Sequence, residues 1–371
     1  MTTPHTWEEV LPEISGSQET RAPSPWDALS LLGGLPDADR FHIQPDSVDL
    51  SLTIGGGEEP PRLGLPLVLS DNSCGQLSPH ARLALIQASH RRGCALRLED
   101  PTPDLVDLAR ELGVVLWVVL GPDRTEAVVE ALEGADIVEL KLTSVGPDGE
   151  LSSAVDLQDA EGSMALAVET VRSVAGGVPI VLNVGPISDR EVLRQAARSG
   201  ADALMVQAAS RNSRMHDGDV GPGPLAAVAS MRRALSRTKF EKDDRVPKLV
   251  ISGGFKDGVE LVKTLALGAD LVVMGTAPRL ALGCTLCNDC GPGECPKGPH
   301  TATTSWKTEA DGLVAFVDRI ADQARSSLSR MGCERGDQAS LAHLEAQTYD
   351  VAAVTGASLA GYGEVLPMWR H

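Results

Sequence analysis

Four of the seven cysteines in this 371-residue chain lie within one short segment. Cys284, Cys287, Cys290 and Cys295 follow the spacing C-x2-C-x2-C-x4-C, and Pro296 comes directly after the last thiol. An iron–sulfur cluster is held by several thiolates from one short irregular loop, and this spacing meets that requirement. Zinc sites more often use two cysteine pairs separated by a longer stretch. The pattern favours an iron–sulfur cluster over zinc, and over thiols that bind no metal.

Two glycine-bearing segments follow apolar runs upstream of these thiols. Ser252, Gly253 and Gly254 end one run, and Gly275 and Thr276 follow the next. Glycine lets backbone N–H groups approach phosphate oxygens, and a helix that begins nearby presents its positive end. The segments predict a phosphate site, for FMN or for a phosphorylated substrate. The alternative interpretation is that these glycines only end strands.

Two further residues have types and positions suited to catalysis. Lys141 stands near the end of an apolar run, where an unpaired ammonium group is costly, so a contact with a cofactor or substrate is favoured over a salt bridge to a neighbouring carboxylate. His216 lies in a Gly/Asp-rich segment and is either a general acid or an ordinary hydrogen-bonding residue. Arg211 and Arg214 either hold a substrate carboxylate or are solvated.

A regular alternation of short apolar runs and helix-like stretches must position these residues. The eight runs cover residues 65–70, 95–98, 114–120, 136–142, 179–184, 201–207, 248–253 and 270–275. Helical spacing of apolar residues lies between them, at 79–91, 103–111, 188–199 and 258–267. Eight β/α repeats predict an α/β fold, a (β/α)8 TIM barrel, whose chemistry takes place at the C-terminal ends of the strands. A doubly wound sheet is less favoured because its Gly-rich nucleotide turn is missing.

The barrel is expected to occupy residues 63–283. An N-terminal arm and cap segment precedes it over residues 1–62, and the iron–sulfur loop and a C-terminal helical extension, with a helix around 312–331, follow over 284–371. The remaining cysteines are scattered, unlike a disulfide framework; Cys94 is expected in the core and Cys333 to be inert.

Composition excludes several classes of function. The formal net charge of −18 disfavours binding to nucleic acids and to anionic membrane surfaces. No run of 18 apolar residues predicts a membrane span, and the N-terminal residues do not resemble a secretory signal, so a cytoplasmic protein is expected.

The segment 251–296 resembles the FMN-binding barrel of the glutamate synthase large subunit. It carries a Gly-Gly turn, a Leu-Gly-Ala-Asp stretch, Gly-Thr-Ala and a Gly-Cys-x5-Cys-x4-Cys-Pro loop in the order of that family. The resemblance implies that Cys284, Cys290 and Cys295 ligate a [3Fe–4S] cluster. Cys287 is additional, and a fourth thiol would permit [4Fe–4S].

Three other segments resemble the same family. Ser73-Cys74-Gly75-Gln76-Leu77-Ser78 is similar to its Ser-Phe-Gly-x-Leu-Ser loop, which implies that Ser73, Cys74 and Gly75 contact the flavin ring. Residues 138–142 look like its strand with an inward lysine, here Lys141. The segment that begins at His216 is similar to a loop over the active site.

The chain also departs from the family pattern. Residues 95–100 replace an Asn-Thr-Gly-Glu-Gly-Gly loop, with Glu99 in the place of the acidic residue. Asn183 stands where a lysine against the flavin is expected, and residues 147–150 lack a Lys-Pro-Gly run. The amidotransferase domain is not found in this sequence, so we do not expect the chain itself to hydrolyse glutamine.

The favoured hypothesis is an oxidoreductase with FMN and an iron–sulfur cluster that reduces an imine or 2-oxo-acid-type small substrate. Lys141, Glu99 and His216 would orient the substrate and transfer protons. Ferredoxin or a reductase subunit would donate electrons through the cluster, and a separate amidotransferase subunit could supply ammonia. One alternative is a non-catalytic electron-transfer or assembly subunit of a glutamate-synthase-like complex. Another is a zinc-stabilised, flavin-free barrel acting on a sugar or isoprenoid phosphate.

Overall fold

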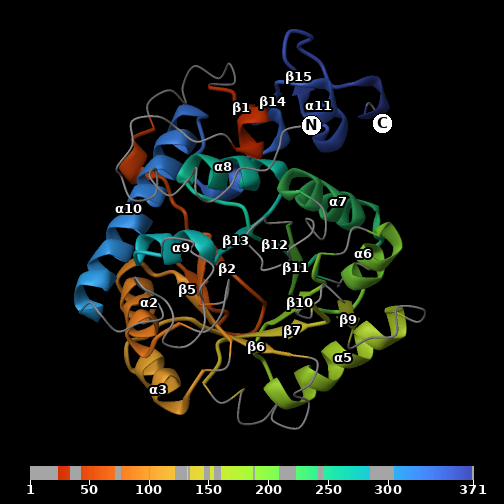
Figure 1. The fold of residues 1–371 in the computed structure, drawn as a ribbon. Coiled ribbons are helices and arrows are strands. Elements are labelled where there is room, and N and C mark those ends of the chain that lie inside the picture. The colour runs from red at the N-terminus through yellow and green to blue at the C-terminus, as the bar shows by residue number, and fades with distance from the viewer. Residues whose placement is uncertain are drawn as a thin grey trace.

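Eight parallel strands close into a barrel in the computed structural model of the chain (Figure 1). The structure describes residues 24–33, 43–71, 77–99, 101–121, 132, 134–145, 151–153, 160–186, 189–208, 223–240, 245–284 and 305–369. The barrel strands, in chain order, are β4 (Leu67–Ser70), β5 (Ala95–Leu98), β6 (Leu116–Leu120), β7 (Ile137–Lys141), β10 (Ile180–Asn183), β11 (Ala203–Gln207), β12 (Lys248–Ser252) and β13 (Leu271–Met274). Each pairs with the next, and β13 pairs with β4 to complete the ring. The predicted TIM barrel is confirmed.

The helices surround the ring of strands (Figure 1). They are α2 (Pro79–Arg92), α3 (Pro103–Glu111), α5 (Ala160–Ala175), α6 (Arg190–Ala197), α7 (Pro224–Arg237), α8 (Gly258–Leu267), α9 (Thr276–Ala281), α10 (Trp306–Arg330) and α11 (Tyr349–Thr355). Local sequence signals set several of their ends. Ser78 and Asp189 accept hydrogen bonds from the first turns of α2 and α6, and Gly268 ends α8 in a left-handed conformation with φ of 108°.

The core consists of two apolar layers. One lies between the strands and the helices, and the other fills the barrel interior. The inner layer comprises Ile54, Leu63, Val68, Ala95, Trp117, Ile137, Val181, Ala203, Met205, Val250, Leu271 and Val273. Ile54 and Leu63 come from the hairpin formed by β2 (Leu52–Thr53) and β3 (Arg62–Leu63), beside Pro179, which precedes a strand. The hairpin therefore closes the N-terminal end of the barrel and leaves the opposite end for a site.

The segments before and after the barrel meet in one small sheet. β1 (Leu29–Leu31) pairs antiparallel with β14 (Leu344–Ala346), which pairs with β15 (Ser358–Leu359). Short 3-10 turns flank these strands, at Pro25–Ala28, Pro45–Ser47, Gly336–Gln338, Leu341–His343 and Pro367–Trp369. The two segments expected to be separate extensions are thus hydrogen-bonded to each other.

Helix α10 packs along α2 and α8 (Figure 1). It covers the seam between the last barrel strand and the first, which is the place of the eighth barrel helix. It begins at Trp306, earlier than the expected 312, because the side chains of Glu309 and Ala310 already lie buried against the barrel helices. The domain boundary expected at residue 283 therefore falls ahead of a helix that contributes to the barrel wall.

A β-hairpin of β8 (Thr143–Val145) and β9 (Leu151–Ser153) follows β7.

Among the described residues, no helix is both long enough and apolar enough to cross a bilayer.

Candidate active site

A buried network of polar side chains crosses the inside of the barrel, above the inner apolar layer. Arg97 on β5 donates two hydrogen bonds to Glu139 on β7, from Nε to Oε2 at 2.6 Å and from Nη2 to Oε1 at 2.8 Å. Trp117 Nε1 donates to the same carboxylate at 2.8 Å, and Asn183 Nδ2 at 2.7 Å. Four bonds from three strands therefore hold one carboxylate, whose side chain is fully buried.

This network shifts the pKa values of its members. Burial alone raises the pKa of Glu139, but the charge and hydrogen bonds of Arg97, with those of Asn183 and Trp117, outweigh it and lower that pKa. Glu139 is therefore ionised, and the pair is a true ion pair. It forms a rigid floor beneath the C-terminal ends of the strands.

Two of the predicted catalytic residues come together above this floor. Lys141 lies two residues after Glu139 on β7, so both side chains point to the same side of the sheet. Its Nζ lies 3.3 Å from Glu99 Oε1, just beyond the end of β5. The exposed fractions of the two side chains are 19% and 29%, so the pair is partly open to solvent. Lys141 therefore forms a salt bridge to a neighbouring carboxylate, which was the less favoured of the two environments expected for it.

The position of Glu99 is fixed by a second set of charges. Its backbone N–H donates to Asp71 Oδ1 at 3.1 Å, and its carbonyl accepts from Arg82 Nη2 at 3.2 Å. Asp71 also pairs with Arg82 at 3.0 Å, and its carbonyl accepts from Arg279 Nη2 at 3.0 Å. Burial raises the pKa of Asp71, although Arg82 opposes the shift. Residues just after β4, on α2 and on α9 thus fix the backbone of Glu99, whose carboxylate faces Lys141.

Asn183 lies beside Lys141 in the register of β10 and β7. Its Nδ2 is bonded to Glu139, and its Oδ1 accepts from the N–H of Gly185 at 2.8 Å. A neutral amide has two donors and two acceptor lone pairs, so one of each remains for a further contact. In this structure Asn183 belongs to the buried floor.

The two glycine loops begin side by side at the C-terminal end of the barrel, because Ser252 pairs with Val273. Gly253 and Gly254 have φ of 96° and 81°, which favours glycine at both positions. A Cβ on Gly253 would also lie 3.3 Å from the carbonyl oxygen of Ala208. The following helix α8 is capped by Asp257, and α9 begins at Thr276, directly after Gly275. This backbone shape fits a phosphate-binding turn, and glycine also meets its local conformational requirement.

Cys284 is the one thiol of the predicted cluster that lies in the described part of the chain. It is buried at 8% exposure, and its N–H donates to the carbonyl of Arg279 at the end of α9. The other predicted site residues Ser73, Cys74, Gly75, His216, Cys287, Cys290 and Cys295 lie outside the described residues. Within the described residues, which include Cys284 but not the other three thiols, no group of three or more metal-ligating side chains occurs. Four closely spaced thiols in the sequence are the type of ligand that iron–sulfur clusters require.

The other two described cysteines lie in the core. Cys94 is 1% exposed, and burial raises the pKa of its thiol to about 12, which makes it inert as a nucleophile. Cys333 is 2% exposed and lies 3.8 Å from His343 Nε2.

Three members of the site, Arg97, Glu139 and Trp117, were not predicted from the sequence. The available signal was a pair of charged residues inside two apolar runs, Arg97 within 95–98 and Glu139 within 136–142. A charge in a buried strand needs a partner, and two opposite charges on strands of one barrel can supply each other.

The conserved region in glutamate synthase matches residues 143–334, which is just over half of the chain. This chain belongs to the glutamate synthase family. An archaeal-type glutamate synthase [NADPH] from Thermotoga sp. (strain RQ2) is 31% identical over 165 residues, 43% of this chain and 30% of the relative. The match to the enzyme of that name from Dehalococcoides mccartyi is 25% identical over 336 residues, 81% of this chain and 65% of the relative. The chain thus spans about a third of the Thermotoga protein and about two thirds of the other.

A ferredoxin-dependent glutamate synthase from Arabidopsis thaliana is 27% identical over 154 residues, 38% of this chain and 9% of the relative. Among solved structures, mandelate oxidase with benzoyl-formic acid superposes with a TM-score of 0.59 at 18% identity, covering 91% of this chain and 90% of the other. A mandelate oxidase variant with an FMN adduct gives a TM-score of 0.57. At such low identity these structures support the barrel fold alone.

Proposed function

We propose that this chain is an FMN-dependent oxidoreductase of the glutamate synthase type, which reduces an imine or 2-oxo-acid-type small substrate beside Lys141 and Glu99. The observation that carries the proposal is this half-buried pair at the C-terminal end of the barrel, in a member of the glutamate synthase family. Barrel enzymes carry their chemistry at that end.

The residues at this end are suited to hold FMN. The FMN phosphate would be bound by backbone N–H groups of two neighbouring loops, which contain Ser252, Gly253, Gly254, Gly275 and Thr276. The left-handed turn at Gly253 and Gly254 brings the main chain close to such a group without a side chain between them. Ser73, Cys74 and Gly75 would contact the ring, and they follow Asp71, which anchors Glu99. FMN bound there would supply the hydride.

Lys141 and Glu99 are proposed to act on the substrate. An ammonium group paired with one carboxylate oxygen at 3.3 Å still has donors free, so it can also bind a substrate oxygen or carboxylate. Glu99 would hold or release a proton at the reacting nitrogen or carbon, with His216 as a second proton donor. The Arg97–Glu139 floor beneath them keeps water out from below and fixes β5 and β7 relative to each other.

The four thiols, Cys284 with Cys287, Cys290 and Cys295, are proposed to bind an iron–sulfur cluster. Such a cluster would supply single electrons to the flavin, which can combine them into a hydride. Relatives are named for NADPH and for ferredoxin, so a reductase subunit or a ferredoxin is proposed as the donor. A separate amidotransferase subunit is proposed as the source of ammonia.

The test has two steps. The visible spectrum of anaerobically purified protein, before and after dithionite, should show flavin bands above a broad iron–sulfur shoulder, and both should bleach. Stopped-flow mixing of the reduced protein with 2-oxoglutarate and ammonium should then reoxidise the flavin. Flavin that bleaches but is reoxidised only by a partner protein would support an electron-transfer subunit instead. Colourless protein that contains zinc after cofactor reconstitution would overturn the oxidoreductase assignment.

A further inference from the structure

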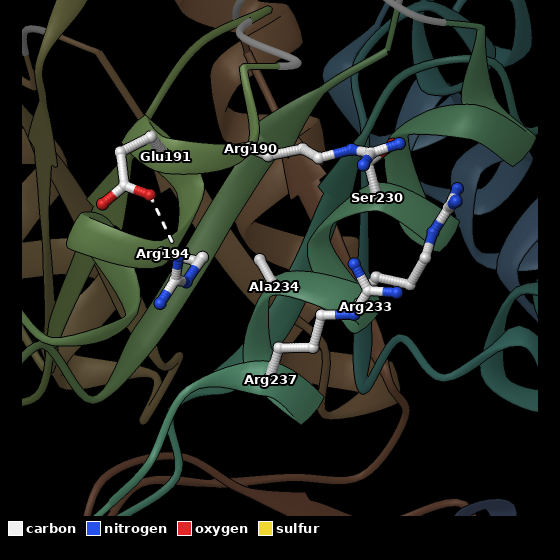
Figure 2. A pocket seen from close by; sticks show the side chains of 7 residues that line it. All are labelled: Arg190, Glu191, Arg194, Ser230, Arg233, Ala234 and Arg237. Atoms are coloured by element: carbon white, nitrogen blue, oxygen red, sulfur yellow. Dashed lines mark hydrogen bonds and ion pairs between the residues drawn. The ribbon is translucent and has the colours of Figure 1, made fainter. Parts of the chain in front are cut away.

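A cavity lies outside the barrel, between α6 and α7. It measures about 390 Å³ and is lined by Arg190, Glu191, Arg194, Ser230, Arg233, Ala234 and Arg237 (Figure 2). This volume lies within the range of small-molecule sites, about 300–1,000 Å³. Because α6 and α7 cover the outer side of the strands, the cavity is separate from the proposed flavin site inside the barrel mouth (Figure 1).

The charge of this cavity opposes that of the whole protein. Two arginines come from α6, four residues apart, and two from α7, also four residues apart. Like charges at this spacing share one helix face and destabilise the helix. Among the described residues that line the cavity, Glu191 is the one acidic residue, and it pairs with Arg194 at 3.1 Å. A cavity with four guanidinium groups and one carboxylate is unexpected in a chain whose formal net charge is −18.

The guanidinium groups differ in how many hydrogen bonds they form with the rest of the protein. Arg233 is held by the carbonyls of Ala229 at 3.0 Å and Val354 at 3.2 Å. Arg190 and Arg237, by contrast, have no hydrogen bond or ion pair within the described part of the chain. Arg194 Nε is buried and also lacks a hydrogen-bond partner there.

These positive charges are close enough to act on one another. Burial lowers the pKa of Arg233, and the charges of Arg190 and Arg237 lower it further. Figure 2 shows Arg190 extending from α6 across the hollow toward Ser230 of α7. A buried donor without an acceptor and three mutually repelling cations would all be stabilised by an anion placed among them.

We propose that this α6–α7 cavity binds a small anion of the phosphate class that carries at least two negative charges. Planar guanidinium forks bind phosphate oxygens through paired hydrogen bonds, and the Ser230 hydroxyl adds a donor. The ligand-sized volume and the convergence of side chains from two helices favour a phosphate-bearing small molecule over an acidic protein surface, which would need a broad exposed patch.

The test is calorimetric titration of the flavin-loaded full chain with sodium pyrophosphate at low salt. Loading with flavin keeps the probe out of the barrel mouth. One site per chain is expected. The double variant R190Q/R237Q should bind at least tenfold more weakly, whereas the matched control R330Q/R335Q, which removes two exposed arginines elsewhere, should stay within twofold. The charge-conserving R190K/R237K should fall between them because lysine lacks the fork.

Three results would overturn the proposal. One is pyrophosphate affinity that is the same in R190Q/R237Q and in the unchanged chain. Another is malonate binding as tightly as pyrophosphate, which would assign the cavity to dicarboxylates. The third is poly-glutamate displacing pyrophosphate at lower concentration, which would make the face a docking site for an acidic protein. The melting temperature of each unliganded variant shows whether it is folded. Because the substitutions remove mutually repelling arginines, this temperature should be unchanged or higher.

Discussion

Arg97 and Glu139 form a two-point ion pair across the inside of the barrel, with N–O distances of 2.6 and 2.8 Å. Their side chains are 6% and 0% exposed. Desolvation of two charges opposes such a pair, and it is retained only where further hydrogen bonds satisfy both groups. Here Trp117 and Asn183 donate further hydrogen bonds to the Glu139 carboxylate, and the Ser70 hydroxyl accepts one from Arg97 Nη1 at 3.2 Å. The pair joins the strands that carry Glu99 and Lys141.

Replacement of one partner of this pair should destabilise the protein strongly. Glu139→Gln leaves a guanidinium buried without its countercharge, and we expect the free energy of unfolding to fall by about 3–5 kcal/mol. Urea denaturation measures it. The matched control is Asp318→Asn, which breaks an exposed pair with Arg92 at 2.7 Å and should cost less than about 1 kcal/mol. An equal loss in the free energy of unfolding in the two variants would show that the buried pair contributes no more to stability than the exposed pair.

Glu260 should make stability depend on pH in the opposite sense to an ordinary ion-paired carboxylate. Burial, with repulsion from Asp257, raises its pKa from 4.5 to about 8, although Ser24 and Lys256 partly oppose the shift. The folded state therefore holds a proton that the unfolded state releases above pH 4.5, so this contribution to stability is lost as pH rises from about 4.5 to about 8. Glu260→Gln should match the unchanged chain near pH 5 and be more stable than it at pH 9, in urea melts at both pH values. A stability difference that does not vary with pH would contradict the assigned ionisation.

The fold was predictable because the barrel strands are buried on both faces and therefore read as continuous apolar runs. All eight predicted strands are present to within two residues at each end, and Ser78 and Asp189 cap α2 and α6. Local chemistry determines these features, so a single sequence reveals them.

The site was less predictable because its contacts join residues far apart in the chain. Lys141 and Glu99 were each singled out, but their mutual ion pair depends on the register of β5, β6 and β7. Arg97 and Glu139 are separated by 42 residues, and each alone looks like an anomaly in an apolar strand. The sheet between β1 and β14 depends on a still more distant pairing, which local periodicity does not report.

Lys141→Met should impair turnover without loss of flavin. If the ammonium group orients the substrate and aids proton transfer, the rate of flavin reoxidation by 2-oxoglutarate and ammonium should fall by about 10²–10⁴-fold. The matched control is Lys248→Met, because Lys248 is also ion-paired, to Asp270 at 2.8 Å, but lies at the start of β12, at the other end of the barrel. A similar loss of rate in both variants, or none in either, would remove Lys141 from the catalytic set.

Gly253→Ala should reduce the flavin content of purified protein. The alanine must adopt a φ of 96°, and its Cβ would lie 3.3 Å from the carbonyl oxygen of Ala208, so the turn proposed to hold the phosphate must move. The control is Gly113→Ala, which carries similar left-handed strain at φ of 66° in open space before β6. Both should lose about 1–2 kcal/mol of stability from backbone strain. The fluorescence of flavin released by heat, which measures flavin content, should fall only for Gly253→Ala. Equal flavin contents in the two variants would show that the turn at Gly253 does not bind the FMN phosphate.

The thiols should differ in what their removal does to bound iron. Cys284→Ser removes a proposed ligand whose backbone is fixed at the end of α9, and iron content should fall to a small fraction of that in the unchanged chain. Cys94→Ser should keep its iron, because Cys94 is a core residue. If all four thiols bind a [4Fe–4S] cluster, Cys287→Ala should leave three ligands and a [3Fe–4S] cluster, which gains an electron paramagnetic resonance signal in the oxidised protein. If the unchanged chain already gives that signal, Cys287 is not a ligand. Iron retained in Cys284→Ser would exclude this segment as the cluster site.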